Sequence, residues 1–392
     1  MKNILKYIAG CIAGLTITAC GDIYEVHEQY ITEGERTYIG HADTVYAQGG
    51  FNKVNLVWKL NVDPRIETCV ITWNGCETPV EIPVNRSVEY MNHVLEIPEG
   101  QYIFSLKMRS KSGEESLTET VEGESYGALY QARLTQRIIT SILATPEKGV
   151  TIEWNAEEGC KKTVLSYINI NGEKKTVVIP ETETTTIITD YVMGSEYEYY
   201  SAYAPEINAY EDINSLSKKG NFPAHYTLSK SEWDNTYHVL YEDIDRTGWL
   251  VTASTEELEG EGATNGRAIA LIDGNLKTFW HSQYKGEGAN PPCPHDIILD
   301  MQHEQEIISV ELARREKNKD TREVEFSISN DGITWSLFGS LTFPNNANPN
   351  SQILLLPTAV KGRYLKVSVV NSNNGVNASI AEIMFTKGIN TF

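Results

Sequence analysis

The feature that most constrains the fold is the alternation of apolar and polar residues over many short stretches. Examples are "VNLVWKL" at 54–60 and "EVEFSIS" at 323–329. Gly, Asn and Pro interrupt these stretches about every ten residues, as turns between strands do. A period of two places every second side chain on a buried face, which is typical of a half-buried β-strand. The pattern therefore predicts an all-β chain made of several sandwich modules.

The N-terminus carries an export signal. Lys2 and Lys6 flank the start of an apolar run, 8–17, which is too short to span a bilayer. The run ends in "ITAC" (17–20), which resembles a bacterial lipobox, so we expect residues 1–19 to be a lipoprotein signal peptide and Cys20 to be lipidated. Such an anchor implies the outer membrane and a surface location. The alternative is an ordinary signal peptide with a coincidental Cys.

Charge and cysteine content exclude some classes of function. The formal net charge is −20, which disfavours nucleic acid as a partner because phosphate binding requires a basic face. Four cysteines remain after Cys20: Cys69, Cys76, Cys160 and Cys293. Their spacing fits neither a zinc site nor a dense disulfide framework, so we interpret them as small buried hydrophobic residues.

The front of the chain repeats one plan twice. An alternating strand carries Trp58 in the first copy and Trp154 in the second. Later in each copy a Gly precedes a Tyr, Tyr102 or Tyr197, that begins another alternating strand. A buried Trp on an early strand and a corner Tyr on a late strand are features of a seven-strand sandwich. The plan resembles immunoglobulin or fibronectin type III modules.

These modules would occupy 20–135 and 136–215, and the polar segment 216–246 reads as a linker that packs partly on its neighbours. The opening half, including "YGALYQARLTQRII" at 126–139, also resembles a domain family of unknown function found in surface lipoproteins of gut Bacteroidetes. Sandwich folds carry no function by themselves. Both front modules are therefore interpreted as spacers, with a binding role as the alternative.

The third module, 247–388, contains seven separated motifs in a characteristic order. They are "GWLVTAS" (248–254), "ALIDGNLKTFWHSQY" (270–284), "PHDIILDM" (294–301), "VELARR" (310–315), "EVEFSISNDGITW" (323–335), "GRYLKVSVVNSNNG" (362–375) and "ASIAEIMF" (378–385). Together they resemble the discoidin, or coagulation factor 5/8 type C, family, and in particular its carbohydrate-binding branch. The resemblance implies an eight-strand jelly-roll sandwich with ligand loops at one end.

The "ALIDGNLKT" segment has the composition of a calcium loop. Ca²⁺ requires six to eight oxygen ligands and a tight turn, and the segment offers Ala270, Asp273, Asn275 and Thr278 around Gly274. The resemblance implies that Ala381 and Glu382 of the last strand complete the site, with calcium in a structural role. The alternative is a plain turn capped by Asp273. Trp280 is expected in the core.

The resemblance also implies a sugar site close to the calcium loop. A lectin-type site combines an aromatic face with a few hydrogen-bonding side chains. The predicted residues are His281, Gln283, Tyr284, Arg315, Asn373 and Asn374. Arg314 stands where the sugar-binding members usually have Pro, and the following loop, "EKNKDTRE" (316–323), lacks their Gly-rich turn. Each of these polar residues has an ordinary solvated role as its alternative.

The functional hypothesis that follows is a non-catalytic surface lipoprotein that captures poly- or oligosaccharides, near proteins of polysaccharide import. The main alternative is an adhesion or scaffold lipoprotein that binds protein. Membrane contact through the discoidin loops is weaker, because "KGEGANPP" (285–292) lacks large apolar tips. A glycoside hydrolase would need two carboxylates across a cleft. The three β modules leave no room for a catalytic barrel, and we expect no enzyme.

Overall fold

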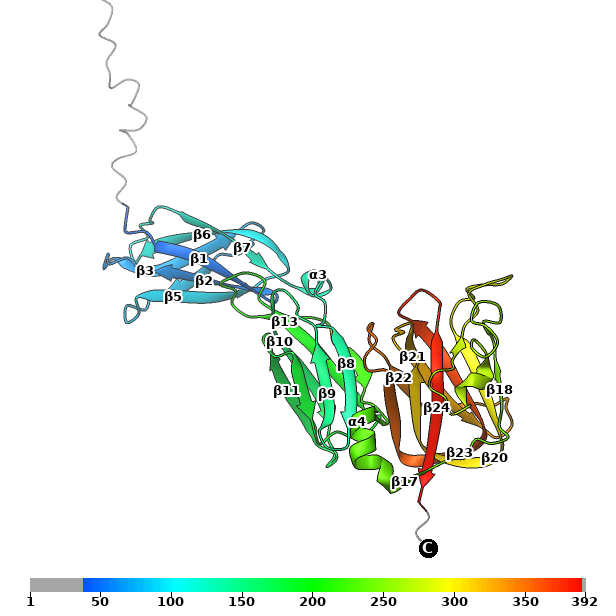
Figure 1. Ribbon diagram of the computed structural model, residues 1–392. Coiled ribbons are helices and arrows are strands. Elements are labelled where there is room, and N and C mark those ends of the chain that lie inside the picture. The colour runs from blue at the N-terminus through cyan, green and yellow to red at the C-terminus, as the bar shows by residue number, and fades with distance from the viewer. Residues whose placement is uncertain (1–37, 390–392) are drawn as a thin grey trace, which may run out of the picture. The chain divides into compact units, whose positions relative to one another are not determined.

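The computed structural model describes residues 38–389. The predicted signal peptide 1–19 and the lipidation site Cys20 lie outside these residues. The described chain is almost entirely β-structure in three modules, which confirms the all-β prediction (Figure 1). Within this range, no helix is both long and apolar enough to cross a bilayer. The chain divides into two compact units, and each is treated separately below.

The first unit is a seven-strand antiparallel sandwich. One sheet has the order β1-β2-β5 and the other the order β4-β3-β6-β7. The strands are β1 (Asp43–Gly50), β2 (Lys53–Lys59), β3 (Ile66–Trp73), β4 (Val80–Pro83), β5 (Tyr90–Glu96), β6 (Gly100–Ser110) and β7 (Glu119–Ser125). A one-turn helix, α3 (Ala128–Gln131), follows. Trp58 lies fully buried between the sheets, as the repeat predicted. The hydroxyl of Tyr102 donates to the carbonyl of Pro98 at 2.9 Å, as a corner tyrosine does.

The second unit begins with another sandwich. Its sheets have the orders β12-β9-β8 and β11-β10-β13-β14, with β15 also paired to β13. The strands are β8 (Ile139–Thr145), β9 (Gly149–Trp154), β10 (Cys160–Ile168), β11 (Lys174–Pro180), β12 (Thr185–Ile188), β13 (Glu196–Tyr203), β14 (Ile213–Asn214) and β15 (Lys218–Asn221). Trp154 is buried against Tyr199, with ring centroids 5.5 Å apart. Alternation thus correctly placed both tryptophans in cores.

The segment expected as a linker is regularly paired. Its first part contributes β15 to the second sandwich. Its later part contributes β16 (Tyr226–Ser229), which pairs with β23, and β17 (Tyr241–Asp243), which pairs with β24. The short helical turns α4 (Lys230–Glu232), η1 (Trp233–Tyr237) and η2 (His238–Leu240) lie between them. A capping box between Ser229 and Glu232 begins this helical stretch.

The C-terminal module is a jelly-roll sandwich whose strands form one continuous nine-strand network. Its remaining elements are β18 (Leu250–Ala253), η3 (Ala268–Leu271), β19 (Trp280–His281), β20 (His295–Arg314), β21 (Thr321–Ser329), β22 (Ser336–Thr342), β23 (Ser351–Ser372) and β24 (Ser379–Gly388). β20 and β23 are long enough to contribute to both layers. Their paired register shifts at Asp300/Gln305, where Gln302 has a φ of 68°. The network includes β16, β17 and β19 in addition to the six longer strands β18 and β20–β24, so it has nine strands where the resemblance implied eight.

An ion pair lies at this register shift. Asp300 accepts hydrogen bonds from Nε and Nη2 of Arg363 at 2.9 and 2.8 Å. This bidentate pair lowers the pKa of the Asp300 carboxyl, chiefly through the hydrogen bonds from Arg363.

Trp280 lies in the core at 0% exposure, and its indole N–H donates to the carbonyl of Thr255. The core position expected for Trp280 is correct.

The four described cysteines are free thiols. Cys69 and Cys160 are buried as predicted, whereas Cys76 and Cys293 are only half-buried. Cys76 belongs to the turn after β3, where its N–H donates to the carbonyl of Trp73 at 2.9 Å. Cys293 lies in the irregular segment before β20, and both residues stay partly open to solvent, so the prediction of burial is wrong for these two.

Candidate functional site

The predicted calcium loop is a tight turn that its own side chains hold closed. Asp273 Oδ1 accepts from the N–H of Asn275 at 2.8 Å, and Oδ2 accepts from the hydroxyl of Thr278 at 2.7 Å. Gly274 between them has a φ of 76°, a conformation that favours glycine. The turn follows η3, whose last residues include the buried Ala270. The segment folds locally as its Asp-Gly sequence predicts.

Glu382 joins this turn to the last strand. It is a residue of β24, next to Ala381, and both are 1% exposed. Glu382 Oε2 accepts from the N–H of Gly274 at 3.0 Å. Burial raises the pKa of Glu382, Arg246 opposes this effect, and the nearby charge of Asp273 adds to it. The distant acid therefore reaches the loop as the family resemblance implied.

The donor set has the chemistry of a hard-cation site. Two carboxylates, Asp273 and Glu382, lie close enough for their charges to repel, and a cation between them would remove that repulsion. The other predicted ligands, Ala270, Asn275, Thr278 and Ala381, supply oxygen atoms only, as calcium prefers. Residues 38–389 contain no cluster of three or more His, Cys, Asp and Glu side chains suited to a metal. Any ion here would depend on carbonyl, amide and hydroxyl oxygens as well.

Beside the Asp273 turn lies a polar strip that includes three of the predicted sugar ligands. Arg315 Nη1 donates to Glu261 Oε1 at 3.2 Å, and the hydroxyl of Tyr284 donates to the same oxygen at 3.0 Å. The ring of Tyr284 packs edge-on against His281, with centroids 4.9 Å apart. We call His281, Tyr284, Glu261 and Arg315 the polar strip.

The groups of the polar strip are held in defined orientations. The guanidinium of Arg315 stacks on Phe279, 3.9 Å from its ring centroid, which fixes a side chain that would otherwise be mobile. His281 is buried, and its Nδ1 contacts the carbonyl of Ser282 at 2.6 Å. A carbonyl can only accept, so Nδ1 carries a proton, and in the neutral form of the ring Nε2 is then an acceptor. Nε2 has no hydrogen-bond partner in the described part of the chain.

The other predicted sugar ligands hold their own loops. Gln283 Nε2 donates to the carbonyls of Lys285 and Glu287 at 3.0 and 2.9 Å. Asn373 Nδ2 donates to the carbonyl of Lys319 at 2.9 Å and so braces the loop after Arg315. Asn374 is exposed, and its N–H donates to the hydroxyl of Ser372. Within residues 38–389, no hydrogen bond connects these three side chains to the polar strip.

The wall of the polar strip depends on a buried carboxylate that the sequence did not single out. Glu257 is 0% exposed and accepts four backbone N–H groups, those of residues 259, 260, 284 and 285, at 2.7–2.9 Å. Burial raises the pKa of Glu257, but the four amides outweigh burial and leave the pKa below its usual value. One side chain thus fixes the acidic loop and the Tyr284 loop together.

Glu261, which completes the polar strip, was also missed. Its partner Arg315 is 54 residues away in sequence, so no local pattern pairs the two. The available signal was the unusual density of glutamates in "TEELEGEG" (255–262), just before the calcium loop. Acid-rich loops are usually solvated surface, which is why that signal did not stand out.

Arg314, at the position where the resemblance led us to expect Pro, is a structural residue. It is 0% exposed, and its guanidinium donates to the carbonyls of Asn346 and Pro349 at 2.8 and 2.7 Å. Longer bonds reach the carbonyls of Thr321 and Pro344. Burial lowers the pKa of Arg314. The side chain points into the domain and leaves Arg315 as the residue of the pair that faces the polar strip.

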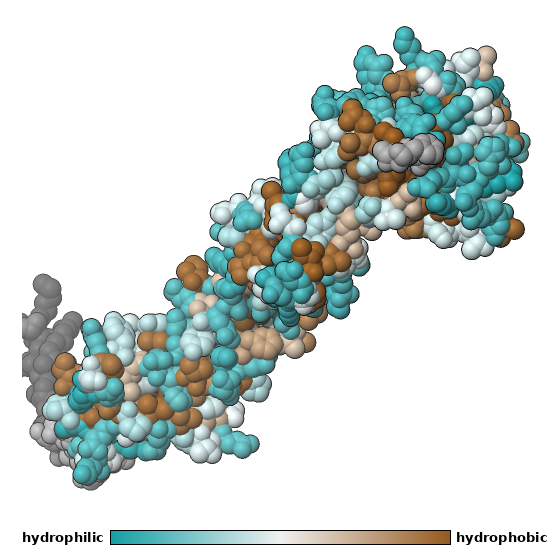
Figure 2. Space-filling model, turned by 90° about the horizontal axis from the view of Figure 1, so that it is seen from below, coloured by the Kyte–Doolittle hydropathy of each residue, from teal (hydrophilic) through white to brown (hydrophobic). Residues whose placement is uncertain are grey.

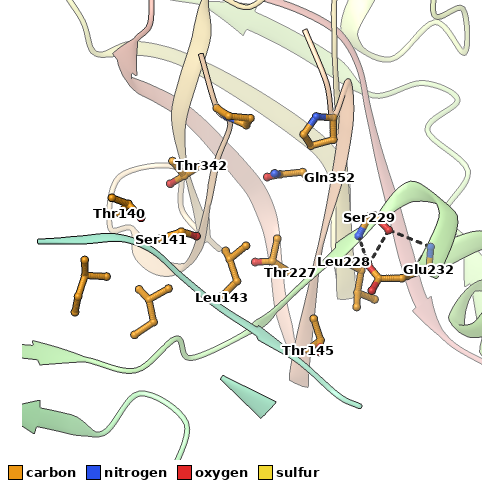
Figure 3. A pocket seen from close by; sticks show the side chains of 14 residues that line it. Thr140, Ser141, Leu143, Thr145, Thr227, Leu228, Ser229, Glu232, Thr342 and Gln352 are labelled. Carbon is orange, nitrogen blue, oxygen red and sulfur yellow. Dashed lines mark hydrogen bonds between the residues drawn. The ribbon is translucent and has the colours of Figure 1, made fainter. Parts of the chain in front are cut away.

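An apolar hollow lies inside the second unit, where the edge strand β8 passes β16 (Figure 3). It is a groove of about 620 Å³. Its apolar lining is Ile139, Ile142, Leu143, Leu228, Pro344 and Pro349. Gln352 also lines it, and the Oε1 atom of this side chain is buried without a hydrogen-bond partner. The groove differs from the polar strip in being mainly apolar.

Comparison with known proteins identifies two domains. Residues 251–383 match the F5/8 type C domain, and residues 20–212 match a domain of unknown function. Both family resemblances are thereby confirmed at the level of the domain. The C-terminal module is an F5/8 type C domain, and the front of the chain carries the domain of unknown function.

Two curated relatives match the C-terminal part alone. Galactose oxidase of Gibberella zeae is 28% identical over 146 residues, 36% of this chain and 20% of the oxidase. Sialidase of Micromonospora viridifaciens is 30% identical over 123 residues, 30% of this chain and 18% of the sialidase. The chain thus spans about a fifth of the length of these relatives. Among solved structures, the C-terminal domain of a chitobiase from Bacteroides fragilis is 32% identical, with a TM-score of 0.33. The match covers 38% of this chain and 100% of the chitobiase domain.

Proposed function

We propose that the protein is a non-catalytic, lipid-anchored surface protein that binds glycans through its F5/8 type C domain. The observation that carries the proposal is the polar strip beside the Asp273 turn. There, Arg315 and Tyr284 converge on one carboxylate, and His281 presents an unpartnered ring nitrogen. A small number of fixed polar groups close together is what a site for a small hydroxylated ligand requires.

Calcium is part of the proposal as a structural ion. Asp273 and Glu382, with oxygens of Ala270, Asn275, Thr278 and Ala381, would hold it. The ion would offset the charge of Asp273, add to the compensation that Arg246 gives Glu382, and tie β24 to the turn that precedes β19. Because β19 carries His281, an ordered turn also keeps the polar strip in place.

The proposed location rests on the predicted N-terminal signal, and the proposed partners rest on the proposed glycan binding. A lipid on Cys20 would hold the chain at the outer membrane and display it at the cell surface. Shallow sugar sites bind weakly one at a time, and many anchored copies offer avidity to a polymer. Neighbouring polysaccharide-import proteins would receive the captured glycan. The front sandwiches serve as spacers in this account.

A second candidate is a protein-binding adhesion or scaffold role. The apolar groove between β8 and β16 favours it, because apolar grooves suit peptide or protein segments better than sugars (Figure 3). Apolar residues also form separate patches on the face seen in Figure 2. The polar strip, in contrast, consists of charged and hydrogen-bonding side chains, which is why glycan binding is the leading proposal.

The test is a glycan array combined with polysaccharide gel retardation of the full chain. Arg315→Ala and His281→Ala are compared with Arg322→Ala, which removes an exposed charge elsewhere in the same domain. Retention of the wild type and of Arg322→Ala, with loss in both strip variants, supports the proposal. Equal retention of all four proteins contradicts the assigned site. A blank screen for the wild type contradicts glycan binding itself.

A further inference from the structure

Glu261 gives the polar strip a negative charge at its centre. The carboxylate accepts from both Arg315 and Tyr284 through Oε1, so it lies between two of the proposed sugar contacts. The side chain of Glu261 is 15% exposed, against 35% for that of Arg315. In the described part of the chain, Oε2 makes no hydrogen bond. A ligand at the strip would therefore meet a carboxylate oxygen that can only accept.

The positive charge of Arg315 is already paired. Its Nη1 is 3.2 Å from Glu261, and its other face stacks on Phe279. A free arginine at a sugar site attracts carboxylates as bidentate partners. Here an incoming carboxylate would have to displace Glu261 or approach it closely. The carboxylate of the ligand and that of Glu261 would then repel each other. Because Glu261 is partly buried, solvent screens this repulsion less than it would at the surface.

The surrounding loop adds to the negative field. Residues 255–267 contain four glutamates, Glu256, Glu257, Glu259 and Glu261, and a single cation, Arg267. Arg267 is turned to the backbone, where Nη1 donates to the carbonyls of Gly262 and Asn265. The hydroxyl of Tyr284 experiences this field. Burial raises the pKa of Tyr284, and the hydrogen bond and charge of Glu261 raise it further.

We infer that the polar strip selects neutral, hydroxyl-rich sugars and excludes sugars that carry a carboxylate, with Glu261 as the residue that discriminates. This inference rests on the proposed glycan-binding function and specifies its ligand class. Glu261 Oε2 and His281 Nε2 accept from sugar hydroxyls, and the remaining N–H groups of Arg315 donate to them. A uronic or sialic acid would place its own charge against Glu261.

The test compares polymers that differ in their carboxylates alone. The probes are polygalacturonate and its carboxyl-reduced product, in which each carboxylate has become a primary alcohol on the same sugar residue. Retardation of the full chain in gels with each probe gives the apparent affinity. We expect the wild type to bind the uncharged polymer about tenfold or more tightly than the charged one. About a tenfold difference in affinity requires only a modest repulsion between Glu261 and the carboxylate of the polymer.

Two variants locate the cause. Glu261→Gln keeps the acceptor for Arg315 and Tyr284 but removes the charge, and should reduce the preference to about twofold or less by admitting the acidic polymer. Glu259→Gln makes the same charge change two residues away on an exposed side chain and should keep the wild-type preference. Equal binding of charged and uncharged members by wild type overturns the inference and leaves the proposed function standing. Equal loss of preference in both variants overturns the role of Glu261, and binding of neither member contradicts the proposed function as well.

Discussion

The guanidinium of Arg246 donates a hydrogen bond to Glu382, a carboxylate of the last strand that is almost completely buried. The same Nη1 atom also donates to the carbonyl of Ile383 at 2.6 Å. The other carboxylate oxygen of Glu382 accepts from Gly274 of the Asp273 turn. One carboxylate thus links three separate segments of the C-terminal domain. The segment before β18 thereby becomes part of the support of the proposed calcium loop.

Replacing Arg246 by Met should destabilise the C-terminal domain strongly. Removing one partner of a buried ion pair leaves the other charge uncompensated, which typically costs about 3–5 kcal/mol. The matched control is Lys387→Met, because Lys387 pairs with Glu242 on the surface at 3.4 Å and such pairs contribute little. Differential scanning calorimetry of the two variants measures the difference. Similar transitions for both would show that the buried pair does not support the domain.

Calcium should raise the thermal midpoint of the C-terminal domain. A ligand that binds only the folded state stabilises it by about 2.7 kcal/mol at a concentration 100 times its Kd. Asp273→Asn should abolish the response. Asp331→Asn should retain the response to calcium. Asp331 closes a similar Asp-Gly turn by accepting from the N–H groups of Ile333 and Thr334, but within the described residues this turn makes no hydrogen bond to Glu382. Superimposed melting curves of wild type in EDTA and in calcium would refute the calcium site.

Glu257→Gln should loosen both loops that Glu257 holds and weaken glycan binding although Arg315 is unchanged. An amide side chain keeps one acceptor oxygen and turns an N–H₂ group toward two backbone donors. Hydrogen exchange of residues 259, 260, 284 and 285 should become faster. The control is Glu287→Gln on an exposed side chain. Unchanged exchange at these four amides would contradict the anchoring role.

The same carboxylate makes a definite pH prediction. The pKa of Glu257 is lower in the folded state than the unfolded value of about 4.3. Its contribution is therefore fully present above the unfolded pKa and is lost as pH falls through the folded pKa. The thermal midpoint of the C-terminal domain should drop in this acidic range less steeply in Glu257→Gln than in wild type. Parallel pH profiles would contradict the account.

Neighbouring arginines should have opposite phenotypes. Arg314→Met leaves four backbone carbonyls without their charged donor and should lower stability by about 3 kcal/mol or more. Arg315→Met should leave stability within about 1 kcal/mol, since the ion pair with Glu261 is partly exposed, while abolishing retention by glycan gels. Denaturant titration and gel retardation of both variants give the comparison. A stable Arg314→Met would show that the buried guanidinium does not support the domain.

The sequence indicated the features that local patterns determine. Alternation placed Trp58 and Trp154 in the cores of the two sandwiches, and the Asp-Gly dipeptide at 273–274 predicted a tight turn that its own side chains close. Motif order identified the F5/8 type C domain. These features depend on residues that are neighbours in the chain or repeat with a fixed period.

The features that sequence did not reveal depend on long-range pairing. Arg246 and Glu382 are 136 residues apart, and nothing local to Arg246 distinguishes it from a solvated arginine. Glu261 meets Arg315 because Glu257 folds the acidic loop against the Tyr284 loop. Arg314 and Arg315 are adjacent in sequence, but their side chains lie in different surroundings. That of Arg314 is buried in the domain, whereas that of Arg315 is partly exposed. Strand register and loop packing decide such cases, and neither follows from residue type.

The measurement that tests the central claim most directly is hydrogen exchange of the full chain with and without a saturating neutral polysaccharide that retards it in gels. If glycans bind at the polar strip, exchange should slow at 257–261, 281–287 and 315–320 and stay unchanged elsewhere. Slower exchange confined to residues 38–222, or to the β8 and β16 groove, would contradict the assignment of glycan binding to the Glu261 and Arg315 site.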